Sequence, residues 1–217
     1  MVEKQNAQKK KMVYDSVLAE IIRGVYNVSS IITEGSLIEK YNVSKSPVRE
    51  ALLELCNDGV ISSIPRTGYR VLPLNYHEMT QALQVRTIIE LSALEMTFSH
   101  LDDAMIAKLE ASLQENKKKL DTHDAYLHWT MNTNFHLQLC SYSGNKYLTQ
   151  TLDSLLKVCL LGAPKYFGES WENKLDRDNQ SRHCKLLQSM RERNLEQAKE
   201  ILKKDISDFS ADFLVHE

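Results

Sequence analysis

The stretch Tyr41-Asn-Val-Ser-Lys-Ser-Pro-Val-Arg-Glu-Ala-Leu-Leu-Glu-Leu55 decides the fold of the first third of the chain. Its apolar residues recur at i, i+3, i+4 and i+7, which predicts an amphipathic helix with one buried face. These residues are Val48, Ala51, Leu52 and Leu55. Lys45 and Arg49 stand one turn apart near the start of this helix, away from that face, where the helix dipole also favours an anion. Phosphate groups and guanine edges are therefore the expected partners.

The segments on either side of this helix favour the same interpretation. A basic pair alone is more often an ordinary solvated face. Residues 33–41 predict a short helix that ends in a tight turn at Asn42, which completes a helix-turn-helix. Residues 60–71 are rich in β-branched side chains and fold back at Pro65-Arg66-Thr67-Gly68, which predicts a wing. Arg66 and Arg70 belong to this wing, and Arg66 is a further candidate for DNA contact.

These motifs resemble the winged helix-turn-helix of the GntR family of bacterial transcription regulators over about residues 13–72. The residues that carry the resemblance are Val43-Ser-Lys-Ser-Pro-Val-Arg-Glu-Ala-Leu52, then Leu55, Gly59 and Gly68-Tyr69-Arg70-Val71. The resemblance implies that double-stranded operator DNA is approached by four residues, which are Lys45, Ser46, Arg49 and Gly68. Lys45 stands where the family usually has arginine, and lysine is a poorer bidentate reader of bases. Arg49 is therefore the best candidate for base contact.

The composition is that of an ordinary globular protein of one large or two small domains, with 217 residues, 42% hydrophobic and 26% charged. No apolar run approaches the roughly 20 residues that span a bilayer, and residues 1–11 lack the hydrophobic core of a signal peptide. We therefore expect a cytoplasmic protein without membrane contact. Four widely spaced cysteines lack any Cys-x-x-Cys pattern, which favours buried, reduced thiols. They are Cys56, Cys140, Cys159 and Cys184.

The charge distribution argues for two copies on one DNA duplex. The net charge is −2, but residues 1–74 hold 10 Lys and Arg against 8 Asp and Glu, and the remainder holds 17 against 21. The N-terminal part is thus basic, although only weakly. A single weakly basic domain binds DNA poorly at physiological salt, so we expect a homodimer that adds the contacts of two domains.

The chain is predicted to be mainly α-helical and to fold as two domains. Residues 1–12 read as a polar tail, and a helix starts at Val13 and ends near Gly24. A proline break at Pro73 separates a winged helix-turn-helix domain, residues 1–73, from a helical effector-binding and dimerisation domain, residues 77–217. Helical periodicity in the second domain predicts an all-α antiparallel bundle. Its six helices are expected at residues 76–99, 102–120, 123–141, 146–166, 169–193 and 195–214.

Four polar residues in this second domain lie where the helical period expects core. Asn132 and His136 project from one helix at i, i+4, His183 precedes an apolar face, and Asp205 interrupts another. Each one alone is more commonly a hydrogen-bonded core residue, because an unpaired buried carboxylate is very costly. Together, two imidazoles, one carboxylate and one amide oxygen suit a divalent metal ion such as Zn, Ni or Mn.

The same segments resemble the C-terminal effector domain, called FCD, of FadR-type GntR regulators over about residues 77–214. The resemblance lies in Asn132-Thr-Asn-Phe-His136, Gly144-Asn145 and His183 before Leu187. Six helices fit the shorter, VanR-like variant. Many members hold a metal through an aspartate four residues before the first histidine and two further histidines. Here Asn132 occupies the aspartate position and Asp205 the last histidine position, so the carboxylate has moved within the set.

The resemblance also implies a small organic acid as effector, held by the metal and a nearby arginine. The matching arginine in Val85-Arg86-Thr-Ile-Ile-Glu90 is Arg86. Arg86 shares a face with Ala82, Ile89 and Ala93, which predicts that it points inward and needs an anionic partner. Glu90 is an equally good partner for Arg86. If these two residues pair, a structural ion pair occupies the place of the effector.

Three functions remain to be compared. The leading one is a homodimeric, ligand-responsive DNA-binding regulator without enzymatic activity. A metal-dependent enzyme of helical-bundle type is the rival from another class, but no general base or nucleophile accompanies the four polar residues. In the third reading the bundle only dimerises and binds no effector.

Overall fold

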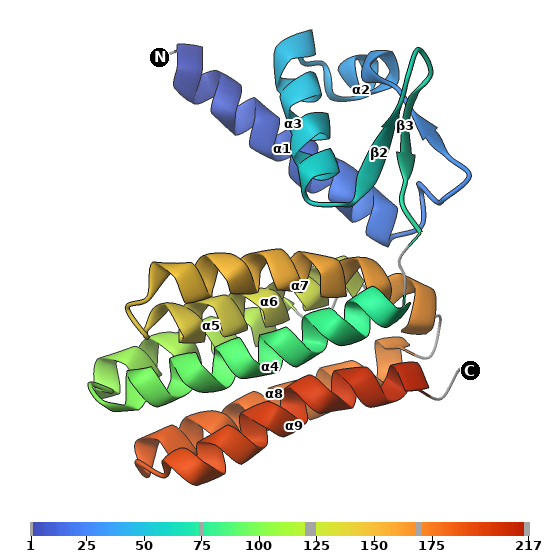
Figure 1. Cartoon of the computed structure of the whole chain (residues 1–217). Helices are drawn as coiled ribbons and strands as arrows, with labels where there is room; N and C mark the ends of the chain where they lie inside the picture. The colour runs from blue at the N-terminus through green and yellow to red at the C-terminus, as the bar shows by residue number, and fades with distance from the viewer. Residues whose placement is uncertain (1, 74–75, 120–124, 168–170, 215–217) are drawn as a thin grey trace. The chain divides into compact units, whose positions relative to one another are not determined.

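Residues Lys45–Asn57 form the predicted amphipathic helix in the computed structural model, which describes residues 2–73, 76–119, 125–167 and 171–214. The chain divides between residues 75 and 76 into two compact units. Figure 1 shows helices and a small sheet in the first unit and helices in the second. We call them the winged unit and the helical unit.

The winged unit consists of three helices and three short strands within its described residues. They follow in the order α1 (Val2–Ile22), β1 (Ile31–Ile32), α2 (Glu34–Tyr41), α3 (Lys45–Asn57), β2 (Ile61–Ile64) and β3 (Gly68–Val71). The strands form an antiparallel sheet of order β1-β3-β2. Ile61 lies opposite Val71 and Ile64 opposite Gly68, so β2 and β3 form the predicted hairpin.

The predicted apolar face of α3 is confirmed. The side chains of Val48, Ala51, Leu52 and Leu55 are buried, and α3 packs against α1. The preceding helix α2 ends at Tyr41 and is capped by Asn42, whose backbone is left-handed with φ of 50°, and this conformation makes the tight turn of the helix-turn-helix. Gly59, with φ of 71°, follows α3 and supplies the left-handed stop.

The predicted polar tail at residues 1–12 is wrong, because α1 begins at Val2. The lysines, glutamines and alanine of this segment are strong helix formers, so the helix extends past the apolar residues that define its core face. Contacts with α3 also hold these early turns. Lys10 Nζ lies 2.8 Å from Glu54 Oε2, and Asn6 donates a hydrogen bond to Glu50.

The helical unit contains six helices and no strand among its described residues, as the periodicity predicted. They are α4 (Tyr76–Phe98), α5 (Asp103–Lys119), α6 (Ala125–Ser141), α7 (Lys146–Phe167), α8 (Trp171–Arg191) and α9 (Leu195–Leu214). Helix α4 contacts α6, α7 and α9, while α8 contacts α5, α6 and α9. An apolar cluster from α4, α6 and α7 forms part of the core: Ile89, Ala93, Cys140, Leu152 and Leu156. This packing brings the inward faces of α4, α6, α8 and α9 together.

The cysteines agree only in part with the prediction of buried thiols. All four are free, and Cys140 and Cys159 are buried. Burial raises the pKa of each of these two thiols to about 11. Cys56 is half-buried, and Cys184 is exposed because it lies on the outer side of α8, next to the inward-facing His183. Among the described residues, no helix has the length and hydrophobicity that a membrane crossing requires.

Candidate nucleic-acid interface and metal centre

The face of α3 opposite its core contacts carries the residues expected to meet DNA. Lys45, Ser46 and Arg49 are all exposed. Lys45 Nζ lies 3.5 Å from Glu34 Oε2 on α2, and the lysine side chain remains 71% exposed. Exposed ion pairs of this kind contribute only about 0–1 kcal/mol, so a phosphate can replace Glu34. Ser46 donates a hydrogen bond of 2.7 Å to Glu50 Oε1 on the next turn.

The tip of the β2–β3 wing has a geometry that requires glycine. Arg66 adopts φ of 64° and is exposed, so the wing presents its guanidinium to solvent. Gly68 has φ of 143°, and a Cβ atom there would lie 2.5 Å from the carbonyl oxygen of Ile32. No other residue fits at this approach of β3 to β1. Gly68 therefore has a structural role, whatever contact it also makes with DNA.

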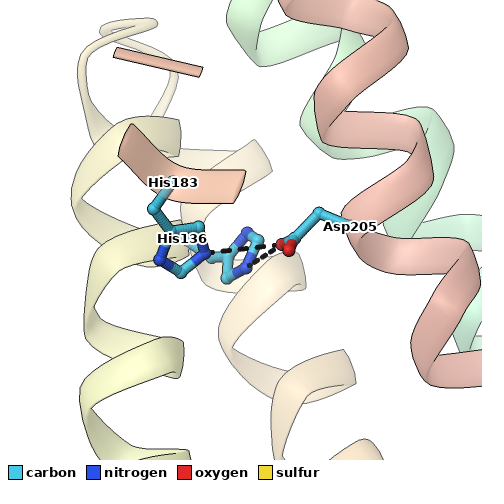
Figure 2. A group of neighbouring side chains, drawn as sticks. All are labelled: His136, His183 and Asp205. Atoms are coloured by element: carbon cyan, nitrogen blue, oxygen red, sulfur yellow. Dashed lines mark ion pairs between the residues drawn. The ribbon is translucent and has the colours of Figure 1, made fainter. Parts of the chain in front are cut away.

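Five ionisable side chains meet in the interior of the helical unit. All five are buried, and they come from four helices: Arg86 and Glu90 from α4, His136 from α6, His183 from α8 and Asp205 from α9. We call them the buried cluster. Figure 2 shows Asp205 reaching across to the two imidazole rings. Helix periodicity places each side chain inward, but only the packing of α4, α6, α8 and α9 brings them together.

Three members of the buried cluster have the arrangement of metal ligands. Asp205 Oδ2 lies 3.2 Å from His136 Nε2 and 3.4 Å from His183 Nε2, and one ligand atom from each residue lies within 4.8 Å of the others. Yet both Nε2 atoms and Asp205 Oδ1 are buried without a hydrogen-bond partner among the described residues. Such unsatisfied groups cost about 1–3 kcal/mol each. A divalent cation would satisfy them, so these residues fit a metal.

The local environment prepares two of these groups, His183 and Asp205, to bind a cation. Burial lowers the pKa of His183 more than Asp205 raises it, which keeps the imidazole neutral and its lone pair available. Burial works against ionisation of Asp205, but the neighbouring His183 and His136 hold the pKa of this carboxyl well below its usual range. Phe135 stacks on His183 with ring centroids 3.9 Å apart and fixes the plane of that ring.

Asn132, the fourth predicted ligand, lies one turn before His136 on α6. Its side chain is half-buried, and its Oδ1 atom has no hydrogen-bond partner in the described part of the chain. The structure thus brings His136, His183 and Asp205 together, and the amide oxygen of Asn132, one turn before His136, has no hydrogen bond of its own to a described residue.

Arg86 forms the structural ion pair that the sequence offered as an alternative. Its Nε donates to Glu90 Oε1 at 2.6 Å, and both side chains are 2% exposed. Burial would raise the pKa of Glu90, but the charges of His136 and Arg86 outweigh it and keep this carboxyl ionised. Burial would likewise lower the pKa of His136, and the charge of Glu90 instead raises it.

Two partners in this region were missed from the sequence. Glu90 Oε2 lies 2.6 Å from His136 Nδ1, a contact between residues 46 positions apart that no local spacing reveals. Arg182 Nη1 lies 3.7 Å from Asp205 Oδ1, with the arginine side chain 19% exposed. Its position directly before His183 is the only sequence signal, and adjacent helix residues usually point in different directions.

Comparisons with known proteins match the two units of the chain to two protein families. Residues 81–208 match the FCD domain, and residues 9–71 match the bacterial regulatory proteins of the gntR family. The chain is 26% identical over 192 residues to the HTH-type transcriptional regulator YdhC of Bacillus subtilis, covering 86% of this chain and 83% of YdhC. It is also 26% identical over 138 residues to the gluconate operon transcriptional repressor of Bacillus licheniformis, covering 64% of this chain and 56% of that repressor.

A solved structure shares the fold over nearly the whole length. McbR/YncC of E. coli superimposes with a TM-score of 0.81 at 18% identity, covering 96% of this chain and 99% of that one. At this identity the likeness shows the fold alone.

Proposed function

Because the chain belongs to the GntR family of bacterial transcription regulators and its helical unit is an FCD effector-binding domain, we propose that it binds operator DNA as a dimer and responds to a small organic acid held at a divalent metal. The relatives it matches are transcription regulators, and the protein is not an enzyme. The observation that carries the proposal is the pairing of an exposed basic face on α3 with a buried set of unsatisfied metal ligands.

The proposed DNA contacts divide by their chemistry. Lys45 at the start of α3 suits a phosphate, which the helix dipole also attracts. Arg49 lies one turn further along the exposed face, and its planar guanidinium suits the O6 and N7 atoms of guanine. Ser46 lies between them, while Arg66 and Gly68 bring the tip of the wing to the backbone of the duplex.

Arg49→Ala is expected to weaken specific operator binding by about 1–3 kcal/mol for each copy of α3 bound to DNA. Arg49→Lys is the matched variant, because it keeps the charge but lacks the bidentate fork, so we expect it to retain binding to random DNA and lose discrimination. Competition between random DNA and the sites found by genomic footprinting measures both effects. If Arg49→Ala still distinguishes operator from random DNA as well as the wild type does, Arg49 does not contact the bases.

The proposal of a dimer is supported by apolar side chains on the outer face of α4. Ile88 is 66% exposed, and Val85 and Met96 are each 42% exposed on the same face. We expect the protein to sediment as a dimer at micromolar concentration and to bind a pseudo-palindromic site. Ile88→Glu should shift it to monomer, whereas Tyr147→Glu, at an exposed position on α7, should not. A wild-type monomer that binds DNA one to one would contradict the proposal.

The metal is proposed to be held by His136, His183 and Asp205, with Asn132 as a further oxygen ligand. Two nitrogens and a carboxylate suit Zn, Ni or Mn. A bound divalent ion supplies a positive charge that can hold a carboxylate, and the gluconate operon repressor of Bacillus licheniformis bears the name of such an acid. One metal ion per chain in purified protein would support this proposal against a bundle that only dimerises.

Arg86 is proposed to bind the effector through guanidinium N–H groups other than Nε. Its Nε donates to Glu90 at 2.6 Å, and the guanidinium carries four further N–H donors that the carboxylate of an acid can engage. Such a contact links the effector to the buried cluster, because Glu90 also contacts His136. An effector that favours one arrangement of α4 shifts the population of that arrangement.

A further inference from the structure

Both ring nitrogens of His136 face an acidic side chain. Nδ1 is hydrogen-bonded to Glu90 Oε2 at 2.6 Å, whereas Nε2 lies 3.2 Å from Asp205 Oδ2 without a hydrogen bond to any described residue. An ionised carboxylate can only accept hydrogen bonds, so Nδ1 must be the donor to Glu90. In the neutral ring the lone pair is therefore on Nε2, the atom that faces Asp205 and His183.

Glu90 is itself held at both of its carboxylate oxygens. Oε1 accepts a hydrogen bond from Arg86 Nε, and Oε2 accepts one from His136 Nδ1. Arg86 and Glu90 lie one turn apart on α4, and both are buried. The carboxylate of Glu90 is thus fixed in place between two donors, and the contact with His136 joins α4 to α6.

We propose that Glu90 is the positioning residue of the metal centre, which it serves through His136 rather than as a ligand. The inference rests on the proposed function, because it requires a metal at His136, His183 and Asp205. A carboxylate that accepts a hydrogen bond from the outer nitrogen of a ligating histidine fixes the ring tautomer and orientation and makes the ligating nitrogen more basic. Arg86 holds that carboxylate in place through its hydrogen bond to Oε1.

The contact of Glu90 with His136 goes beyond what an ion pair within α4 requires. A purely structural ion pair would need only Arg86 and Glu90, which satisfy each other within one helix turn. The short contact with His136 instead couples the pair to the ring that carries a candidate ligand atom. Loss of such an outer carboxylate typically lowers metal affinity by about 10–100-fold.

Zinc titration of full-length variants tests the inference. Glu90→Gln keeps the size of the side chain and removes its charge, and we expect zinc affinity to fall by about 10–100-fold. Glu95→Gln is the matched control on α4, since Glu95 is 61% exposed beside Lys199, and its affinity should not change. Because Glu90→Gln leaves the buried Arg86 without a counter-charge, the double variant Arg86→Met/Glu90→Gln is titrated as well, with circular dichroism to verify its fold.

Nuclear magnetic resonance separates positioning from a general loss of structure. In the zinc-loaded wild type, the Nδ1 proton of His136 should be protected and shifted downfield by the carboxylate. In the folded variants this signal should move upfield or exchange away while the backbone amide spectrum persists. If the wild type binds zinc and the folded variants bind it with the same affinity, the inference about Glu90 is wrong, while the metal site itself stands. A wild type that binds no zinc would overturn both.

Discussion

Replacing Arg86 with methionine is expected to lower the free energy of unfolding of the helical unit by about 3–5 kcal/mol. Arg86 is 1% exposed, and its partner Glu90 would be left with a buried charge that is compensated only by the contact with His136. Urea denaturation followed by tryptophan fluorescence measures the loss, because both tryptophans, Trp129 and Trp171, belong to the helical unit. The effect should appear without any effector present.

Two further variants distinguish the effect of breaking the buried ion pair from the effect of removing any arginine. Arg191→Met removes a half-exposed guanidinium that pairs with Glu110 at the surface, and such changes cost little. The double variant Arg86→Met/Glu90→Gln removes both buried charges and should recover part of the lost stability, since buried pairs replaced together are often close to neutral. If Arg86→Met is as stable as Arg191→Met, the buried charge of Glu90 does not need Arg86 as a partner.

Removal of bound metal is expected to destabilise the wild type by about 4 kcal/mol when free metal had been present at roughly a thousand times its dissociation constant. Protein purified without chelator should carry close to one divalent ion per chain, measured by elemental analysis. His136→Ala or His183→Ala should strongly lower this content, and chelator should then barely move the melting curve. Asn132→Asp should tighten binding, because it supplies a second carboxylate.

The exposed His100 provides the control for these histidine variants. It bonds through Nε2 to the carbonyl oxygen of Tyr142 and lies outside the three-residue metal group. His100→Ala should therefore leave metal content and the response to chelator unchanged. If the wild type contains no metal and its melting curve does not respond to chelator, the buried cluster is a polar core, and an effector must be held without metal.

The fold could be predicted wherever one local rule governed a long segment. The apolar period of α3, the β-branched wing and the helical periodicity beyond Pro73 each gave the correct element. The inward direction of His136, His183 and Asp205 also followed from that period, because each lies where the period expects a core residue. Helix α1 was predicted too short, since the core pattern begins at Val13 while helix propensity and contacts with α3 extend the helix to Val2.

The partners within the buried cluster could not be predicted in the same way. Periodicity says that a side chain points inward, but not which residue of another helix it meets. The spacing of Arg86 and Glu90 predicted their pairing as one of two alternatives, whereas the contact of Glu90 with His136 depends on the packing of α4 against α6. Arg182 was missed because its approach to Asp205 requires the α8–α9 arrangement.

The distribution of the cysteines makes selective chemical labelling practical. Cys140 and Cys159 are buried, and their pKa of about 11 leaves them almost entirely as unreactive thiols. Burial also raises the pKa of the half-buried Cys56. The exposed Cys184 is thus the preferred site for a maleimide fluorophore or a spin label. A probe there sits on the residue next to His183, so the native chain, without any engineered cysteine, can report spectroscopically on events at that histidine.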